Sequence, residues 1–204
     1  MHSIYEEVLG ESYKKLHPQL QRRYAIIENR PFIAEGKMEY ITGGSFLVRI
    51  LLRIGAPLRL FFAERGRNTP FRICNFCENR DGYRIVRWER TFLFPHVKRY
   101  FDAYMFLQDN EVVDYFGKPP LLVSTLFFRV NELGAMCITT KKQWIRIGKW
   151  NIQLAKKLYG HAEIEETFDE SLQCFIIIVR VSNPILGELF SYKGTFREIE
   201  SDYK

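Results

Sequence analysis

Apolar and polar residues alternate with a period of two over most of the chain after Pro70, and this rhythm constrains the fold more than any other feature of the sequence. Neighbouring side chains of a β-strand point to opposite faces, so the alternation is typical of strands that bury one face. It predicts a series of strands after a first strand at about 32–41. Their ranges are 70–79, 83–94, 96–108, 111–116, 121–131, 135–147, 160–168, 171–182 and 187–199.

Turn residues separate these strands closely, and short connections favour antiparallel neighbours. A sheet of this size rarely stays flat and open, and closure into a barrel removes its exposed edges. We therefore expect an α+β chain of mostly antiparallel β-structure, as a strongly curved sheet or a closed barrel of about nine to ten strands. The segment CFIIIVRV, residues 174–181, is apolar on both faces and is expected to be a central strand.

Helical patterns precede most of the strands. An N-terminal helical segment, 1–30, has Ser3 as a candidate N-cap and Pro18 as the point that divides it. Ser45 precedes a second amphipathic helix, expected near 44–64, which would be inserted between the first strand and the remaining ones.

We expect one domain over residues 1–204, with the sheet or barrel spanning 32–199, because no linker-like segment interrupts the chain. A short helix is expected at 150–158, across one end of the sheet. The first twenty residues lack a basic stretch followed by an apolar one, so we expect a cytoplasmic protein, with peripheral membrane contact as an alternative. The most apolar window, which starts at Phe46, carries three arginines and is unlike a membrane-spanning helix.

Cys74 and Cys77 have C-x-x-C spacing, but residues three apart in a strand lie on opposite faces, about 10 Å from each other. Structural thiols are therefore favoured over a redox pair or a zinc site. The sequence has no phosphate-loop, dinucleotide-binding, nucleophile-elbow or zinc-protease motif, and its four histidines are scattered. We accordingly expect no metal, no cofactor and no catalytic residue, and favour a protein that is not an enzyme.

Arg90 is the charged member of an otherwise apolar row. The residues that alternate onto one face of strand 83–94 are Val86, Trp88, Arg90, Phe92 and Phe94. A buried guanidinium must be paired or must face a wet cavity. One interpretation is an anchor for the carboxylate or phosphate of an amphiphilic ligand. The other is a structural ion pair with Glu163, Glu165 or Asp114, or a cation–π contact on the outer face of the sheet.

The aromatic content of 15% suits the walls of a cavity as well as a packed core. Our leading hypothesis is a non-enzymatic domain that holds an apolar or amphiphilic, lipid-like molecule in an aromatic-lined β cavity, where Arg90 orients the polar end. The other lining candidates, taken from the alternation, are Trp88, Phe92, Phe101, Met105, Leu126, Phe128, Phe175, Phe190, Tyr192 and Phe196. A further alternative is a cofactor-free enzyme that uses a cavity carboxylate and Tyr192 on a hydrophobic substrate.

Basic residues are concentrated between Gly44 and Tyr100, where twelve Lys and Arg stand against four Asp and Glu. Part of this region, 46–67, also carries phenylalanines, and its candidate surface residues are Arg49, Arg53, Arg59, Phe61 and Phe62. The pattern is typical of a solvated surface, or of one that docks on an anionic membrane or a partner protein. Nucleic acid is the least favoured partner, because the basic residues are spread over several elements.

Five segments resemble the bacterial domain-of-unknown-function family numbered 4166. They are IYEEVLGESYKKLHP from Ile4, FIAEGKMEYITGG from Phe32, the W-x-R-x-F of Trp88, Arg90 and Phe92, VVDYFG at 112–117 and NPILGELFSYKGTF at 183–196. Similar proteins occur alone or as the C-terminal part of longer proteins, whose N-terminal portion looks like a nucleotide-binding dehydrogenase or a membrane segment. The resemblance implies a single domain and a role in small-molecule or envelope metabolism, with a dehydrogenase-like or membrane partner. It singles out Arg90 and implies no substrate or oligomeric state.

Overall fold

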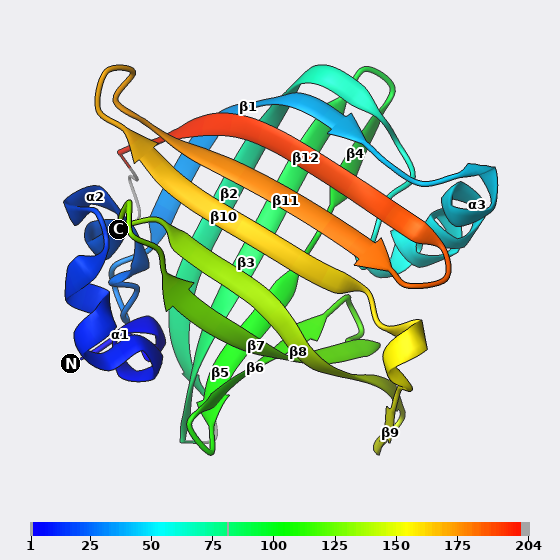
Figure 1. Cartoon of the computed structure of the whole chain (residues 1–204), viewed down its shortest axis with the longest axis horizontal. Helices are drawn as coiled ribbons and strands as arrows, with labels where there is room; N and C mark the ends of the chain where they lie inside the picture. Colours follow the sequence, from blue (N-terminus) through cyan, green and yellow to red (C-terminus); the bar gives the residue numbers. More distant parts are fainter. Residues whose placement is uncertain (1, 81, 201–204) are drawn as a thin grey trace.

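The structure is a computed structural model that describes residues 2–80 and 82–200. Ten antiparallel strands form a closed barrel in the order β10-β11-β12-β1-β2-β3-β5-β6-β7-β8, and the pairing of β8 with β10 closes the ring (Figure 1). β4 pairs with β3, and β9 extends the sheet beside β8. The predicted fold class is confirmed, and the closed barrel is the form that the sheet takes.

The strand bounds follow the alternation closely. They are β1 (Phe32–Thr42), β2 (Gly66–Arg80), β3 (Tyr83–Phe94), β4 (Val97–Tyr100), β5 (Ala103–Gln108), β6 (Glu111–Phe116), β7 (Leu122–Val130), β8 (Met136–Ile147), β9 (Trp150–Gln153), β10 (His161–Asp169), β11 (Cys174–Asn183) and β12 (Gly187–Glu198). The single strand expected at 96–108 is divided in two. Between the two parts, Phe101 and Asp102 donate their backbone N–H groups to the carbonyl oxygens of Arg90 and Arg59, respectively, which interrupts the regular ladder.

The helix expected at 150–158 is wrong. These residues form β9, which pairs back onto β8, and a short 3₁₀ turn, η3 (Lys156–Leu158). Ile147 lies opposite Trp150, so only Gly148 and Lys149 connect the two strands. Gly148 adopts a positive φ of 59°, which a two-residue hairpin connection favours. The segment therefore forms a hairpin although its local pattern predicts a helix.

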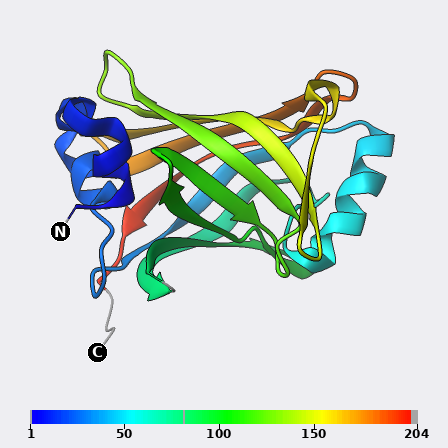
Figure 2. The same ribbon diagram turned by 90° about the horizontal axis from the view of Figure 1, so that it is seen from below.

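Helices close both ends of the barrel. The elements are α1 (Ile4–Leu9), η1 (Gly10–Lys15), α2 (Pro18–Tyr24), α3 (Phe46–Gly55) and η2 (Ala56–Leu58). Figures 1 and 2 show α1, η1 and α2 at one end and α3 at the opposite end. Ser3 and Ser45 act as the N-caps of α1 and α3, and Pro18 is the first residue of α2. None of the helices within residues 2–80 and 82–200 is long and apolar enough to cross a bilayer.

Two glycines let β1 and β12 approach each other closely. Gly36 lies opposite Phe196, and Gly194 lies opposite Met38. A Cβ on Gly36 would overlap the carbonyl oxygen of Thr195, and a Cβ on Gly194 would come too close to the backbone of Lys37 and Met38. Glycines of this kind are used where a strand bends or another backbone comes near, as the closing of a barrel requires.

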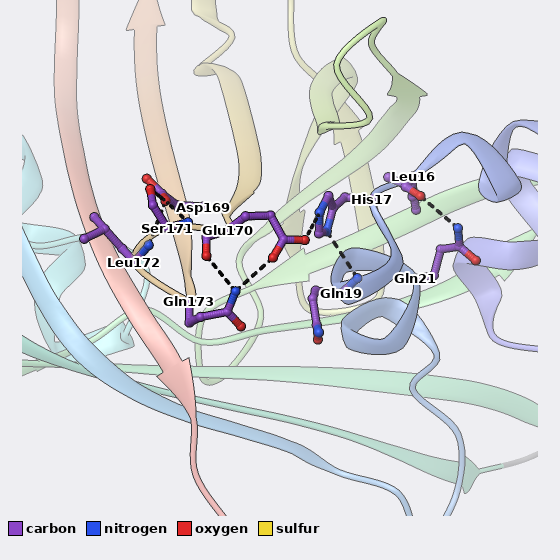
Figure 3. A network of polar contacts seen from close by, with 9 residues as sticks. All are labelled: Leu16, His17, Gln19, Gln21, Asp169, Glu170, Ser171, Leu172 and Gln173. Carbon is purple, nitrogen blue, oxygen red and sulfur yellow. Dashed lines mark hydrogen bonds and ion pairs between the residues drawn. The ribbon is translucent and has the colours of Figure 1, made fainter.

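A polar network joins the N-terminal helices to the turn between β10 and β11 (Figure 3). His17 accepts a hydrogen bond of 3.3 Å from the backbone N–H of Gln19, and its Nε2 lies 3.0 Å from Oε1 of Glu170. Gln173 donates to Oε2 of the same carboxylate at 2.8 Å. The His17 ring also stacks on Phe168 with the centroids 5.2 Å apart. The helical cap is therefore fastened to the rim of the barrel.

Candidate functional site

Arg90 points from the middle of β3 into the barrel and is 3% exposed. Its Nε donates a 2.9 Å hydrogen bond to the carbonyl oxygen of Phe101, and its guanidinium carbon lies 4.0 Å from the centroid of the Phe101 ring. The same guanidinium carbon lies over the ring of Trp88, 5.6 Å from its centroid. Nη2 is buried without a hydrogen-bond partner. Because arginine stays charged, this interior position carries a cation whose donors are not all used.

Asp114 of β6 is the carboxyl group that faces this cation. It is fully buried, and neither of its oxygens has a hydrogen-bond partner. Burial raises the pKa of Asp114 to about 8, and the charge of Arg90 opposes this shift. A carboxyl group with such a pKa holds its proton at neutral pH and can act as a hydrogen-bond donor. The structural alternative of a tight ion pair with Arg90 is therefore not realised.

The hydroxyl of Tyr192, on β12, is the third unused polar group. It is fully buried, and burial raises its pKa whereas the nearby Arg90 lowers it. Arg90 and the hydroxyl are close enough to interact, but the hydroxyl has no hydrogen bond of acceptable geometry. Buried polar groups usually have partners, so an unsatisfied guanidinium with two unsatisfied groups near it needs an explanation such as water or a ligand.

A small cavity lies beside Arg90 and Asp114, which both line it. Its volume is about 30 Å³. The remaining wall is mostly apolar: Trp88, Phe101, Met105, Phe116, Leu126, Ile138, Thr139, Ala162, Ile164, Val179 and Val181. A cavity needs roughly 10–15 Å³ to hold one water, so this one has room for about two waters. A larger molecule would have to displace side chains.

Aromatic rings separate the cavity from the end of the barrel that α3 covers. Phe101 stacks on Phe116 at a centroid distance of 5.5 Å. Phe61 lies 6.4 Å from Phe101 and 6.3 Å from Phe190, and Phe190 lies 5.9 Å from Phe101. We call Phe61, Phe101, Phe116 and Phe190 the aromatic plug. Through Phe61 it connects the segment that follows α3 to Phe101, whose ring contacts Arg90.

The lining candidates taken from the alternation are all buried inside the barrel, but they divide into two groups. Trp88, Phe101, Met105 and Leu126 line the cavity with Arg90. The others pack elsewhere in the core; they are Phe92, Phe128, Phe175, Phe190, Tyr192 and Phe196. Ligand binding by these residues stays a prediction.

The residues expected on a docking surface are placed less uniformly. Arg53 is exposed and Arg49 half-buried, while Arg59 pairs with Asp102 at 2.8 Å. Phe62 is buried, with its ring 4.8 Å from Phe92, so it is not on the surface. Phe62 turns inward because the chain leaves α3 through η2 and its backbone then bonds to the barrel, where Lys118 and Asp102 donate N–H groups to the carbonyl oxygens of Leu58 and Arg59.

The barrel holds a second polar cluster that was not predicted from the sequence. Arg23, at the end of α2, is fully buried and pairs with Glu166 of β10, and its Nη1 donates to Asn75 at 2.9 Å. Tyr24 donates to Glu166 at 3.3 Å. Glu166 could have been found, because the alternation that places Ile164 inward places Glu166 on the same face. This cluster is well paired, which is the expected state of a structural ion pair.

Glu163 and Glu165, the other partners considered for Arg90, are exposed on the outside of β10. Cys74 and Cys77 both lie within β2 as half-buried free thiols, and burial raises the pKa of each. Among the residues that the structure describes, no group of three or more His, Cys, Asp or Glu side chains is arranged to hold a metal ion.

A larger hollow, of about 490 Å³, lies on the outer wall over β3, β5 and β6. Two of its three tyrosines stack on each other: the ring centroids of Tyr104 and Tyr115 lie 4.9 Å apart, with the rings parallel within 2°. Arg87 and Arg146 cover the two outer faces of this pair. The groove is open to solvent, and its polar lining is not desolvated, so the interior cluster is the stronger candidate site.

Comparison with known proteins assigns the family. The model of a family described as a domain of unknown function, DUF4166, matches residues 16–196. The chain belongs to this family. Uncharacterized protein YndH of Bacillus subtilis (strain 168) is 47% identical over 205 residues, which cover 99% of this chain and 100% of the relative. The resemblance seen in the sequence is thereby confirmed.

Three of the segments that carry the DUF4166 resemblance meet inside the barrel. The W-x-R-x-F segment brings Arg90 from β3, VVDYFG brings Asp114 from β6, and NPILGELFSYKGTF brings Tyr192 from β12. These segments are far apart in the sequence, so only the closed barrel places their polar groups around one guanidinium. We take Arg90, Asp114 and Tyr192 as the candidate site of this DUF4166 domain.

Proposed function

We propose that this DUF4166 barrel is a binding domain for a small amphiphilic molecule whose anionic end, a carboxylate or a phosphate, is held at Arg90. The observation that carries the proposal is the set of desolvated polar groups without hydrogen bonds on Arg90, Asp114 and Tyr192, of which Arg90 and Asp114 line a cavity with apolar walls. Ligand sites commonly combine such walls with a few converging polar groups.

All three groups can donate to the same anion. Arg90 supplies Nη2, Tyr192 its O–H and Asp114, when protonated, its O–H. Hydrogen bonds to an ionised partner are shorter and about twice as strong as neutral ones. Deprotonated Asp114 would repel the ligand instead, so we expect affinity for an anion to fall as the pH rises through about 8, the pKa of Asp114.

Entry requires the aromatic plug to move, because the cavity of about 30 Å³ is far smaller than a lipid-like molecule. Phe61 is half-buried and belongs to the segment after α3, where the backbone leaves regular structure. Gly43 and Gly44, both at positive φ, connect β1 to α3 and provide a hinge at the N-terminal side of α3. A ligand would take the place of the plug, with its apolar part directed toward α3.

The test combines native mass spectrometry of the protein purified from cells with titration by anilinonaphthalene sulfonate, a fluorescent anionic amphiphile. Tyr192→Phe keeps the ring and removes one donor, and Arg90→Met removes the cation with little loss of volume. We expect a co-purified acid in the parent protein, and losses of probe affinity of about tenfold for Tyr192→Phe and about a hundredfold for Arg90→Met.

Arg129→Met, on the outer face of β7, is the matched control and should bind the probe like the parent protein. Circular dichroism checks that each variant is folded. Absence of any co-purified molecule, together with equal probe affinity in parent and variants, would disprove the proposed function.

A further inference from the structure

Helix α3 turns apolar side chains outward. Only Val48, Leu52 and Gly55 of this helix are buried against the barrel. Five large apolar residues form the opposite, exposed side: Phe46, Leu47, Ile50, Leu51 and Ile54. Phe46 is 77% and Ile54 69% exposed. A surface helix normally exposes its polar residues, so this apolar side indicates a binding surface.

Two loops at the same end of the barrel also carry exposed apolar residues. The β8–β9 hairpin carries Trp150, which is 78% exposed, and Ile147 and Ile152, which are also exposed. The turn between β11 and β12 carries Ile185, which is 64% exposed. Both views show α3, this hairpin and this turn at the end of the barrel opposite α1 and α2 (Figures 1 and 2). We call these three elements together the docking face.

The charge of the docking face selects its occupant. Residues 46–58, 147–153 and 184–187 contain three Lys or Arg and no Asp or Glu, and η3, which follows the hairpin, adds two lysines. The basic residues are Arg49, Arg53, Lys149, Lys156 and Lys157. A second copy of the chain packed on this face would bring like charges together, whereas an anionic lipid surface attracts each of them, with about 1 kcal/mol for each residue near the surface.

We propose that the docking face binds the surface of an anionic lipid bilayer. The exposed side of α3 inserts its apolar residues among the acyl chains near the headgroups, and Trp150 sits at the interface, where tryptophan is favoured. Arg53, Lys149, Lys156 and Lys157 contact the lipid phosphates. This proposal goes beyond ligand binding and stands whether or not the interior holds a molecule.

The experiment is co-sedimentation of the full chain with vesicles of phosphatidylcholine alone and of phosphatidylcholine mixed with phosphatidylglycerol. We expect binding to the anionic vesicles and at least a tenfold weaker binding to the neutral ones. The substitutions Phe46→Ser and Ile54→Ser should each weaken the binding about tenfold, because each removes an inserted side chain. These positions are exposed, so the fold should not change.

Charge is tested separately. The pair Arg53→Glu with Lys149→Glu should abolish binding to the anionic vesicles, and salt should weaken the binding of the parent protein. The matched controls lie at the other end of the barrel. They are Leu133→Ser for an exposed apolar residue, and Lys14→Glu with Lys15→Glu for the same change of net charge. Both should bind like the parent protein.

Three results would overturn the proposal. One is the absence of vesicle binding by the parent protein. Another is an equal loss in the controls, which would show a general effect of charge or stability. The third is a dimer in analytical ultracentrifugation that Phe46→Ser converts to a monomer while vesicle binding is unaffected, which would assign the face to a second copy of the chain.

Discussion

Two buried arginines inside the barrel differ in whether their charge is compensated by a carboxylate. Arg23 has a carboxylate, an amide oxygen and aromatic faces around its guanidinium, and its charge is compensated by Glu166. Arg90 has one carbonyl acceptor and a carboxyl group, Asp114, that makes no hydrogen bond. Burial of a charge is costly unless it is paired, so the charge of Arg23 is compensated within the fold, whereas Arg90 keeps the donor that our proposal assigns to a ligand.

Asp114→Asn should change the pH dependence of stability. The folded pKa of Asp114 is about 8, well above its ordinary value of 3.8, so the folded protein binds a proton that the unfolded chain releases between these values. Stability contributed by this group is therefore present below about pH 4 and is lost as the pH rises toward about 8, with a slope of at most about 1.4 kcal/mol per pH unit.

The neutral asparagine lacks this proton equilibrium. In urea unfolding at a series of pH values, the variant should be more stable than the parent protein by a few kcal/mol near pH 8, roughly in line with the size of the shift. The difference should shrink toward pH 4. Parallel curves for the two proteins across the range would show that Asp114 is ionised in the folded state.

The pairing of β1 with β12 depends on two glycines. Gly36 and Gly194 lie one on each strand, and each faces the backbone of the other strand at a distance that a Cβ would not permit. Alternation alone does not reveal this requirement, because the glycines occupy positions of otherwise regular strands. The close approach arises from the curvature of the barrel.

Gly36→Ala and Gly194→Ala are expected to lower the free energy of unfolding by about 1–3 kcal/mol each, because the added methyl group forces the strands apart. Gly160→Ala is the control, since a Cβ there would meet its nearest neighbour at an ordinary 3.6 Å. Urea unfolding measures all three variants. Equal stability of the three would mean that β1 and β12 are not held as closely as described.

The barrel closes along a short seam. β8 and β10 pair over Met136–Thr139 and Glu163–Glu166. Glu166 stands at the end of this seam, and its partner Arg23 comes from α2, at the other end of the sequence. The ion pair thus joins the helical cap to the strand that completes the barrel, and the network of His17 and Glu170 reinforces the same junction.

Arg23→Met should therefore destabilise the whole chain by about 3–5 kcal/mol, because Glu166 is left buried without its partner. The double variant Arg23→Met with Glu166→Leu removes both charges and should recover most of this loss. We expect one cooperative transition, with tryptophan fluorescence and circular dichroism coinciding, as the single domain over 1–204 predicts. A double variant no more stable than Arg23→Met would contradict the ion-pair explanation.

Sequence alone determined the class of this fold, which follows from the period of two in most strands after Pro70, and it placed Arg90 in one row with Trp88 and Phe92. Whether that row faces into the barrel was decided by the tertiary structure. The sequence also determined the caps of α1 and α3, because a cap depends on residues within one turn. The tertiary structure decided the closure of the sheet, the pairing of Arg23 with Glu166, the gathering of Asp114 and Tyr192 around Arg90 and the small size of the cavity. Each of these depends on contacts between distant segments, which only the curvature and register of the closed barrel bring together.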